Sequence, residues 1–277
     1  MSSKVRASFA QEVAKPNAQI NLAYAALLIS EYLTGAIDIT SWLVILDEMA
    51  DSVQSQVQEA STELEVIHAL NHFMFRERGF SGNAQNYYHT NNSFLNKVLE
   101  LKTGIPITLS VIYIEVGRRL GLPVWGIGLP GHFIVGYGLS DSPIYVDVFN
   151  RGRLLSEDEC LALANESSIN RLAFKHEILR PATPKAILYR MLLNLKHIYV
   201  EGEVWELAYK TVDLMLLVRP DEVTEIRDRG LLAYRLDRLH EAVFNIKRYL
   251  YLEPRSFEAA WLEKRVETME EQLLRLN

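Results

Sequence analysis

A strongly apolar run from Ile105 to Gly121 is followed at once by three short segments rich in β-branched and aromatic residues. The run, IPITLSVIYIEVGRRLG, has the length of a helix, with Pro106 in its first turn, where the missing N–H costs nothing. The three segments, PVWGIGL, HFIVGYG and PIYVDVF, are separated by glycine and proline, as strands joined by tight turns are. A buried helix packed on a small antiparallel sheet is an α+β fold, and this feature limits the architecture more than any other.

Two polar side chains in the second and third strand segments are predicted to meet. If HFIVGY pairs with IYVDVF around the GLSDSP turn, a symmetric register places Ile134 opposite Asp147 and His132 opposite Phe149. His132 and Asp147 then share one face as diagonal neighbours, roughly 7 Å apart at Cβ. The carboxylate would fix the ring tautomer and raise its basicity, as in a catalytic triad. The alternative is a strand-edge histidine and a capping aspartate.

Helices are predicted on the N-terminal side of this core. The segment from about residue 17 to residue 80 shows helical spacing of apolar residues. Thr40 is a candidate N-cap of the second helix, and Ser61 or Thr62 of the third. The polar stretch SGNAQNYYHTNNS reads as a loop before the short helix SFLNKVLELKTG, for which Asn92 or Ser93 is the candidate N-cap.

The C-terminal third contains an internal repeat. Pro220 and Pro254 are 34 residues apart, as are Ala208 and Ala242. This period, with small residues for close helix packing that include Gly230, matches the tetratricopeptide pattern. About two units and a terminal helix are visible. We therefore expect residues 1–180 to form an α+β domain with a helical N-terminal part, and residues 181–277 an all-α repeat domain.

Composition narrows the classes of function. The net charge of −6 argues against a general nucleic-acid binder, which needs a basic face. The single cysteine excludes an intramolecular disulfide framework, and the opening residues lack the apolar core of a signal peptide. The longest apolar runs are too short to cross a bilayer. We expect a cytoplasmic protein with no nucleic-acid or membrane partner.

Several motifs in the same order resemble a known family. GIPITLSVIYIEVGRRLGLP, LPGHFIVGY and IYVDVFNRGRLLS, with NNSFLNKVLE upstream, are similar to the transglutaminase-like core in its SirB N-terminal-domain form. The resemblance spans about Phe73 to Leu155, and it implies a cysteine-protease-type fold with a linked tetratricopeptide tail. It also implies that His132 and Asp147 match the second and third members of the family's catalytic triad.

The first member of that triad is missing. Transglutaminase-like enzymes carry a cysteine at the start of the buried helix, in a Gly-x-Cys motif, where the helix N-terminus favours the thiolate. Here Gly104-Ile105-Pro106 occupies the motif, and proline has no nucleophile. This departure argues against thiol-based acyl transfer.

Three other residues are candidate substitutes for the cysteine. Thr108 and Ser110 lie on the same helix, and Thr108 would need His132 as its base. The competing interpretation is that both hydroxyls bond nearby helix carbonyls. Cys160, in a predicted helix, is interpreted as a buried structural residue. Asn92 is a candidate to line the cleft beside His132, together with Pro106 and Ser110.

A metal site is not expected. His68 and His72 have the i,i+4 spacing of two ligands, but Ala69 stands where zinc peptidases place glutamate. No further His/Cys cluster completes a set. We predict neither a metal nor another cofactor.

Two hypotheses remain from the sequence. The favoured one is a non-enzymatic interaction or regulatory factor that binds a protein or peptide partner through its repeat tail and a residual His/Asp cleft. The other is a hydrolase or acyltransferase acting on amide or peptide bonds, with His132 as base, Asp147 as orienter, and water or Thr108 as nucleophile.

Overall fold

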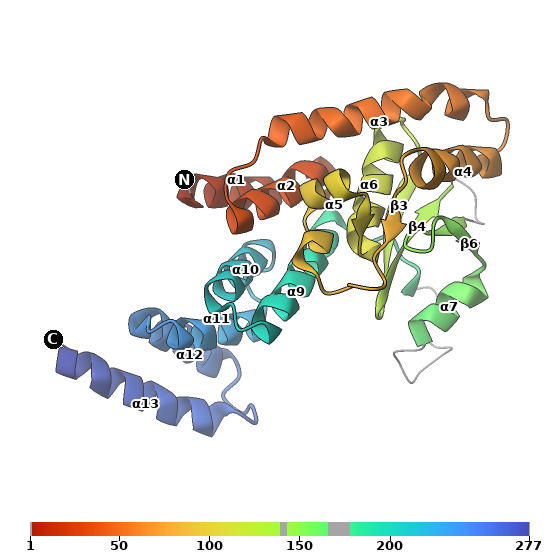
Figure 1. Ribbon diagram of the computed structural model, residues 1–277. Coiled ribbons are helices and arrows are strands. Elements are labelled where there is room, and N and C mark those ends of the chain that lie inside the picture. Colours follow the sequence, from red (N-terminus) through yellow and green to blue (C-terminus); the bar gives the residue numbers. More distant parts are fainter. Residues whose placement is uncertain (1, 139–142, 166–177, 277) are drawn as a thin grey trace. The chain divides into compact units, whose positions relative to one another are not determined.

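The computed structural model describes residues 2–138, 143–165 and 178–276. Contacts within the chain divide it into two compact units, Met1–Met191 and Leu192–Asn277. The first unit combines helices with small sheets, and the second is helical, so the predicted α+β class with a helical tail is confirmed (Figure 1).

The helices that precede the main sheet are α1 (Ser2–Ala14), α2 (Leu22–Thr34), α3 (Ile39–Glu59), α4 (Glu63–Asn71), α5 (Leu95–Leu101) and α6 (Pro106–Arg119). A π-helical turn covers His72–Glu77, and 3-10 turns cover Asn17–Gln19 and Thr90–Ser93.

Three helix caps test the sequence predictions. Thr62, one of the two predicted caps, caps α4, and the structure adds a capping box with Glu65. The cap of α3 is Asp38 rather than Thr40, because the charged Asp38 side chain accepts a hydrogen bond from the backbone N–H of Ser41. The prediction for α5 is wrong as well: its N-cap is Phe94, which makes no side-chain cap, while Asn92 and Ser93 lie in the preceding 3-10 turn.

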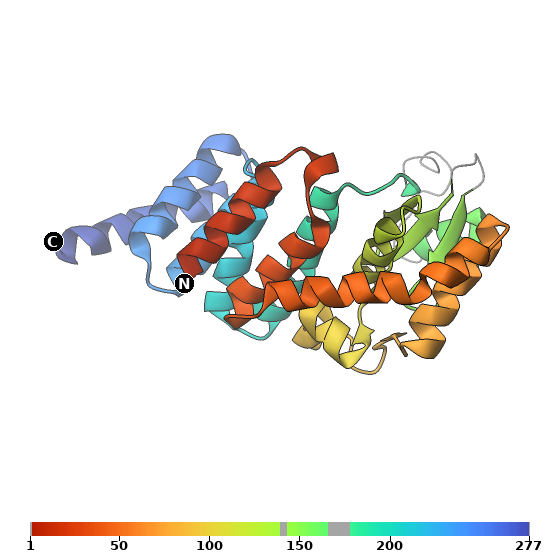
Figure 2. The ribbon, with the colours of Figure 1, turned by 90° about the horizontal axis from the view of Figure 1, so that it is seen from above.

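Helix α6 is the centre of the first unit. Ile105 is extended, as a residue before proline prefers, and Pro106 begins the helix as predicted. Every residue from Pro106 to Gly117 is buried, because the helix lies between the main sheet and helices α2, α3 and α5 (Figures 1 and 2). Gly117 allows close approach to the sheet, since a Cβ there would come within 2.7 Å of the Val124 side chain.

The main sheet has four antiparallel strands in the order β3 (Val124–Leu129), β4 (His132–Tyr137), β5 (Ile144–Asp147) and β6 (Arg153–Leu155). The sequence predicted the first three strands, and β6 is an addition. Strands β1 (Ser81–Gly82) and β2 (Thr103–Gly104) form a separate two-stranded parallel pair.

The register between β4 and β5 is the one predicted. Val135 pairs with Val146 and Gly136 with Tyr145, so continuing the ladder places Ile134 opposite Asp147. The face of the sheet that carries Ile134 and Tyr145 packs against Cys160 of helix α7 (Glu157–Asn165). The opposite face packs against α6, where a Cβ on Gly126 would lie 3.2 Å from Ile114.

The remaining helices are α9 (Pro184–Glu201), α10 (Trp205–Val218), α11 (Val223–Arg235), α12 (Leu239–Leu252) and α13 (Ala259–Leu276). Helix α9 begins at Pro184, and the division between the two units falls inside this helix, after Met191.

The 34-residue period is visible in the backbone. Helices α10 and α12 begin 34 residues apart and end 34 residues apart. Glu203 and Asp237, just before them, both have positive φ, at 53° and 56°. Gly230 lets α11 approach α12, because a Cβ there would lie 2.7 Å from Ile246. The repeat predicted from the sequence is therefore confirmed as a repeat of structure.

Among the helices of the described residues, none is long and apolar enough to cross a membrane.

Candidate functional site

His132 and Asp147 meet at the end of the main sheet. His132 Nε2 lies 3.1 Å from Asp147 Oδ1, so the predicted proximity of the two side chains is confirmed. Within the described residues His132 Nε2 makes no hydrogen bond, so this approach to the carboxylate is a close contact. The Asp147 side chain is 1% exposed and that of His132 is 15% exposed. With Nε2 turned toward Asp147, the other ring nitrogen is the one that a reacting group could use.

The turn after β5 holds the Asp147 carboxylate. Asn150 donates its backbone N–H to Oδ1 at 3.2 Å and its side-chain amide to Oδ2 at 2.8 Å. Burial raises the pKa of Asp147, but the contacts with His132 and Asn150 together lower it by more, so the pKa of Asp147 lies below its ordinary value of 3.8. Asp147 is thus held as a carboxylate beside His132.

Aromatic residues and one arginine surround this pair. Phe149 meets the His132 ring edge-on at 6.2 Å between centroids, and Tyr87 meets Phe149 at 6.0 Å. Arg190 of α9 donates from Nη1 to the carbonyl of Leu129 at 2.6 Å, just before the β3–β4 turn. Sequence reasoning missed Tyr87 and Arg190, because they lie about 45 and 58 residues from His132 and no local pattern marks them.

The side chains at the start of α6 are buried. Pro106 is the first residue of the helix. Thr108 is fully buried, and its hydroxyl donates to backbone carbonyl oxygens. The oxygen of Asn92 lies at 2.6 Å and that of Ile105 at 3.1 Å. The Ser110 hydroxyl is also fully buried, and within the described ranges it has no hydrogen-bond partner.

Asn92 organises the loop in front of α6. Its side-chain amide donates to the carbonyls of Asn86 and Tyr87, at 2.7 and 3.0 Å, and its oxygen accepts from Asn83 at 3.1 Å. Only 2% of Asn92 is exposed. These contacts position Tyr87, which in turn contacts Phe149.

Cys160 lies in the core on the α7 side of the sheet. It is fully buried, in a cluster with Ile134 and Tyr145. Burial, with the nearby carboxylates of Glu159 and Glu157, raises the pKa of the Cys160 thiol to about 12. The residue is therefore a protonated thiol at neutral pH, which is a poor nucleophile.

Comparison with known proteins identifies the family of each unit. The family model described as "Transglutaminase-like superfamily" matches residues 40–193, and the model described as "Tetratricopeptide repeat" matches residues 195–267. The chain belongs to the transglutaminase-like superfamily. The resemblance inferred from the sequence is confirmed.

Relatives occur in bacteria and in animals. A UPF0162 protein of Xylella fastidiosa (strain Temecula1) is 36% identical over 234 residues, which cover 83% of each chain. A UPF0162 protein of Vibrio cholerae is 32% identical over 178 residues, 63% of this chain and 64% of the relative. Human F-box only protein 21 is 29% identical over 180 residues, 61% of this chain and 28% of that protein. A crystal structure of menin covers 88% of this chain and 68% of its own at 13% identity, with a TM-score of 0.40.

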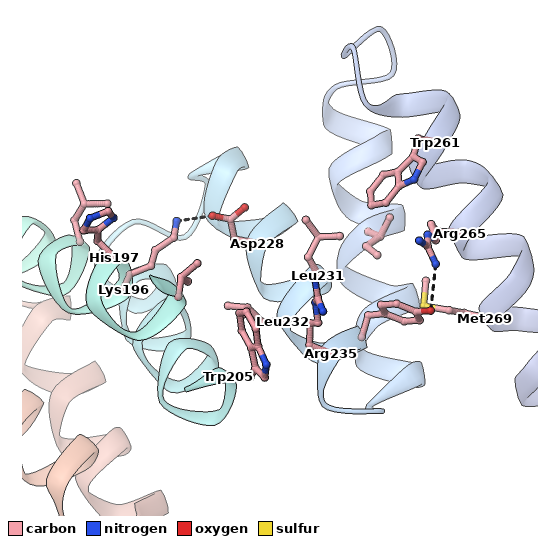
Figure 3. Close-up of a pocket in the computed structure, with 14 residues that line it drawn as sticks. Lys196, His197, Trp205, Asp228, Leu231, Leu232, Arg235, Trp261, Arg265 and Met269 are labelled. Carbon is pink, nitrogen blue, oxygen red and sulfur yellow. Dashed lines mark hydrogen bonds and ion pairs between the residues drawn. The ribbon is translucent and has the colours of Figure 1, made fainter. Parts of the chain in front are cut away.

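The tetratricopeptide unit contains a second candidate site, called here the repeat pocket. It has a volume of about 750 Å³ and is lined by residues of α9, α10, α11, α12 and α13. Figure 3 shows side chains from these helices turned toward one another, with Lys196 reaching Asp228. Apolar side chains in the lining remain exposed, and Trp261 is 50% exposed. The sequence predicted a partner-binding tail but not which residues line it.

Metal ligands do not gather in the part of the chain that the structure describes: no three His, Cys, Asp or Glu side chains are close enough to hold an ion. His72 contacts Glu77 at 3.0 Å.

Proposed function

We propose that this chain is a non-enzymatic protein-interaction factor of the cytoplasm. Its transglutaminase-like domain keeps the orienting pair of a catalytic triad but not a nucleophile, and its tetratricopeptide unit binds a protein partner. The observation that carries the proposal is Pro106 at the start of α6, where enzymes of this superfamily have cysteine.

The available substitutes support the same conclusion. The Thr108 hydroxyl donates a hydrogen bond to the Asn92 backbone carbonyl, and Cys160 is a buried thiol whose pKa is raised to about 12. A histidine and a carboxylate without an attacking group supply only part of an acyl-transfer mechanism. We assign His132 and Asp147 a role in binding and in holding the end of the sheet.

A second candidate function is hydrolysis of an amide bond by water. The observation in its favour is the retained His132–Asp147 contact of 3.1 Å, which is the arrangement of a base and its orienter. In this alternative, Thr108 could take the place of water as the nucleophile, with His132 as its base.

One experiment distinguishes the two functions. The folded protein is incubated with thiol-directed and serine-directed acylating probes, and labelled residues are located by mass spectrometry. In parallel, a panel of fluorogenic peptide amides is offered to the protein and to His132→Ala. We expect no labelling of Thr108, Ser110 or Cys160 in the folded state and no hydrolysis above the rate of the variant. Labelling or hydrolysis that disappears in His132→Ala would establish an enzyme.

A further inference from the structure

The repeat pocket carries two arginines whose charge is not neutralised. Arg235 of α11 lies over the Trp205 ring at 5.1 Å. Arg265 of α13 lies over the rings of Trp261 and Tyr234, at 5.3 and 5.6 Å. Within the residues that the structure describes, neither guanidinium has an ion pair with a carboxylate, and the one hydrogen bond recorded is from Arg265 to the Tyr234 hydroxyl at 3.3 Å.

The other ionic groups of the pocket are already paired. Lys196 contacts Glu225 at 2.7 Å and Asp228 at 2.5 Å. Asp228 also contacts Arg227 at 2.8 Å. The charge left for a ligand is therefore positive and comes from Arg235 and Arg265, which Figure 3 shows on α11 and α13.

The aromatic rings hold these guanidiniums in place. An arginine stacked on an aromatic face loses less rotamer freedom on binding, while its N–H donors at the edge stay available. A guanidinium with free donors binds a carboxylate with two parallel hydrogen bonds. The geometry thus offers two prepared carboxylate-binding positions.

Apolar surface accompanies the two positions. Leu193 is 44% exposed, Val200 36% and Trp261 50%, and all three line the pocket. A ligand that buries these side chains must be apolar in part. A nucleic acid does not fit, because the chain carries a net charge of −6 and the pocket offers only two unpaired cations.

We propose that the repeat pocket binds a peptide segment of a partner protein that carries Asp or Glu beside aliphatic or aromatic residues, with Arg235 and Arg265 contacting the carboxylates. This inference rests on the proposed function, which it makes specific by naming the chemistry of the partner segment. The free volume of about 750 Å³ suits a few side chains of such a segment.

The test uses the full chain and a phage-displayed library of random dodecapeptides. We expect the enriched peptides to be rich in Asp and Glu next to apolar residues. Binding of one enriched peptide, followed by fluorescence polarisation, should weaken roughly tenfold or more in Arg235→Gln and in Arg265→Gln, because each loses a charge-assisted contact. Binding should also weaken as salt is raised.

Charge reversal and a matched control sharpen the result. Arg235→Glu/Arg265→Glu should select peptides rich in Lys and Arg from the same library. Arg275→Gln is the control, since Arg275 is on α13, its side chain is 81% exposed, and it does not line the pocket; it should bind the selected peptide as the parent does. Thermal melts followed by circular dichroism check that each variant folds.

Three outcomes would overturn the inference. In the first, the selected peptides show no enrichment in Asp or Glu, and their binding is lost in Trp261→Ala. The pocket would then be a docking site for another kind of segment, which rejects the acidic ligand and keeps the proposed function. A dimer in solution that Trp261→Ala converts to a monomer would make a second copy the occupant. If the library yields no enriched peptide at all, the result would count against binding of an acidic segment and also against partner binding by the repeat unit.

Discussion

Among individual side chains, Asp147 connects two segments of the first unit through its contacts with His132 and Asn150. Asp147 accepts two hydrogen bonds from Asn150 and contacts His132, so one carboxylate joins the start of β4 to the turn after β5. Removing one partner of such a buried contact leaves polar groups without compensation.

Substitution of Asp147 should reveal this link through its pH dependence. The folded-state pKa of Asp147 is below 3.8, so its stabilisation is fully present above that value and is lost as pH falls through the folded pKa. We expect Asp147→Asn to lower the free energy of unfolding by about 2 kcal/mol at neutral pH. This loss of stability relative to the parent should become smaller as the pH falls below 3.8 and the Asp147 carboxylate of the parent becomes protonated. Urea denaturation at a series of pH values measures both quantities.

The control for that series is Asp221→Asn. The Asp221 side chain is 99% exposed, and its ion pair with Arg248 spans 3.7 Å, so it should match the parent at every pH. An Asp147→Asn deficit that stays constant down to acid pH would show that the carboxylate charge is not what stabilises the turn.

The meeting of His132 and Asp147 could be predicted from the sequence, because strand alternation and a symmetric hairpin register determine which side chains share a face. Tyr87 and Arg190 could not, since they reach the site from a loop and from α9 by tertiary packing. The hydrogen bond from Thr108 to the Asn92 carbonyl could not be predicted either, because it joins residues that are 16 positions apart and no local pattern marks it.

Among the helices and strands, α6 could be predicted because a helix that is buried on every side carries apolar residues on every side. Strand β6 was missed because Arg153–Leu155 is three residues long, too short for an alternating pattern. The cap of α5 was misplaced because Asn92 and Ser93 belong to a 3-10 turn that itself connects the loop to the helix.

Close packing of α11 on α12 depends on Gly230. A Cβ at this position would lie 2.7 Å from Ile246 Cγ1 and 3.1 Å from the Ile246 backbone nitrogen. We expect Gly230→Val to lower the free energy of unfolding by about 2 kcal/mol through overpacking. Chemical denaturation followed by circular dichroism measures the change.

Ala260→Val is the matched control for that substitution. Ala260 is exposed on α13, where the same side chain should cost only about 0.5 kcal/mol of helix propensity. Equal losses at the two positions would mean that the small residue of the repeat is not needed for helix packing.

For the molecule as a whole, the two units divide the proposed work. The unit Met1–Met191 contains the transglutaminase-like core with its His132–Asp147 pair, and the unit Leu192–Asn277 contains the repeat pocket. The order of these parts could be predicted, since short β-branched strand segments give way along the sequence to a repeat with a 34-residue period. The position of the division within α9 could not, because a helix continues through it without a break in pattern.

In the proposed function, the transglutaminase-like domain keeps His132 and Asp147 but has proline in place of the nucleophile at position 106. The decisive measurement is the rate at which iodoacetamide alkylates Pro106→Cys at about pH 6, where an ordinary thiol is mostly protonated. Intact-mass spectrometry follows the wild-type chain, Pro106→Cys, and Pro106→Cys/His132→Ala in parallel, after circular dichroism confirms that each is folded. We predict no alkylation of the wild-type chain and rapid alkylation of Pro106→Cys that slows at least tenfold without His132. Equal rates for the two Pro106→Cys proteins, or alkylation of the folded wild-type chain, would contradict it.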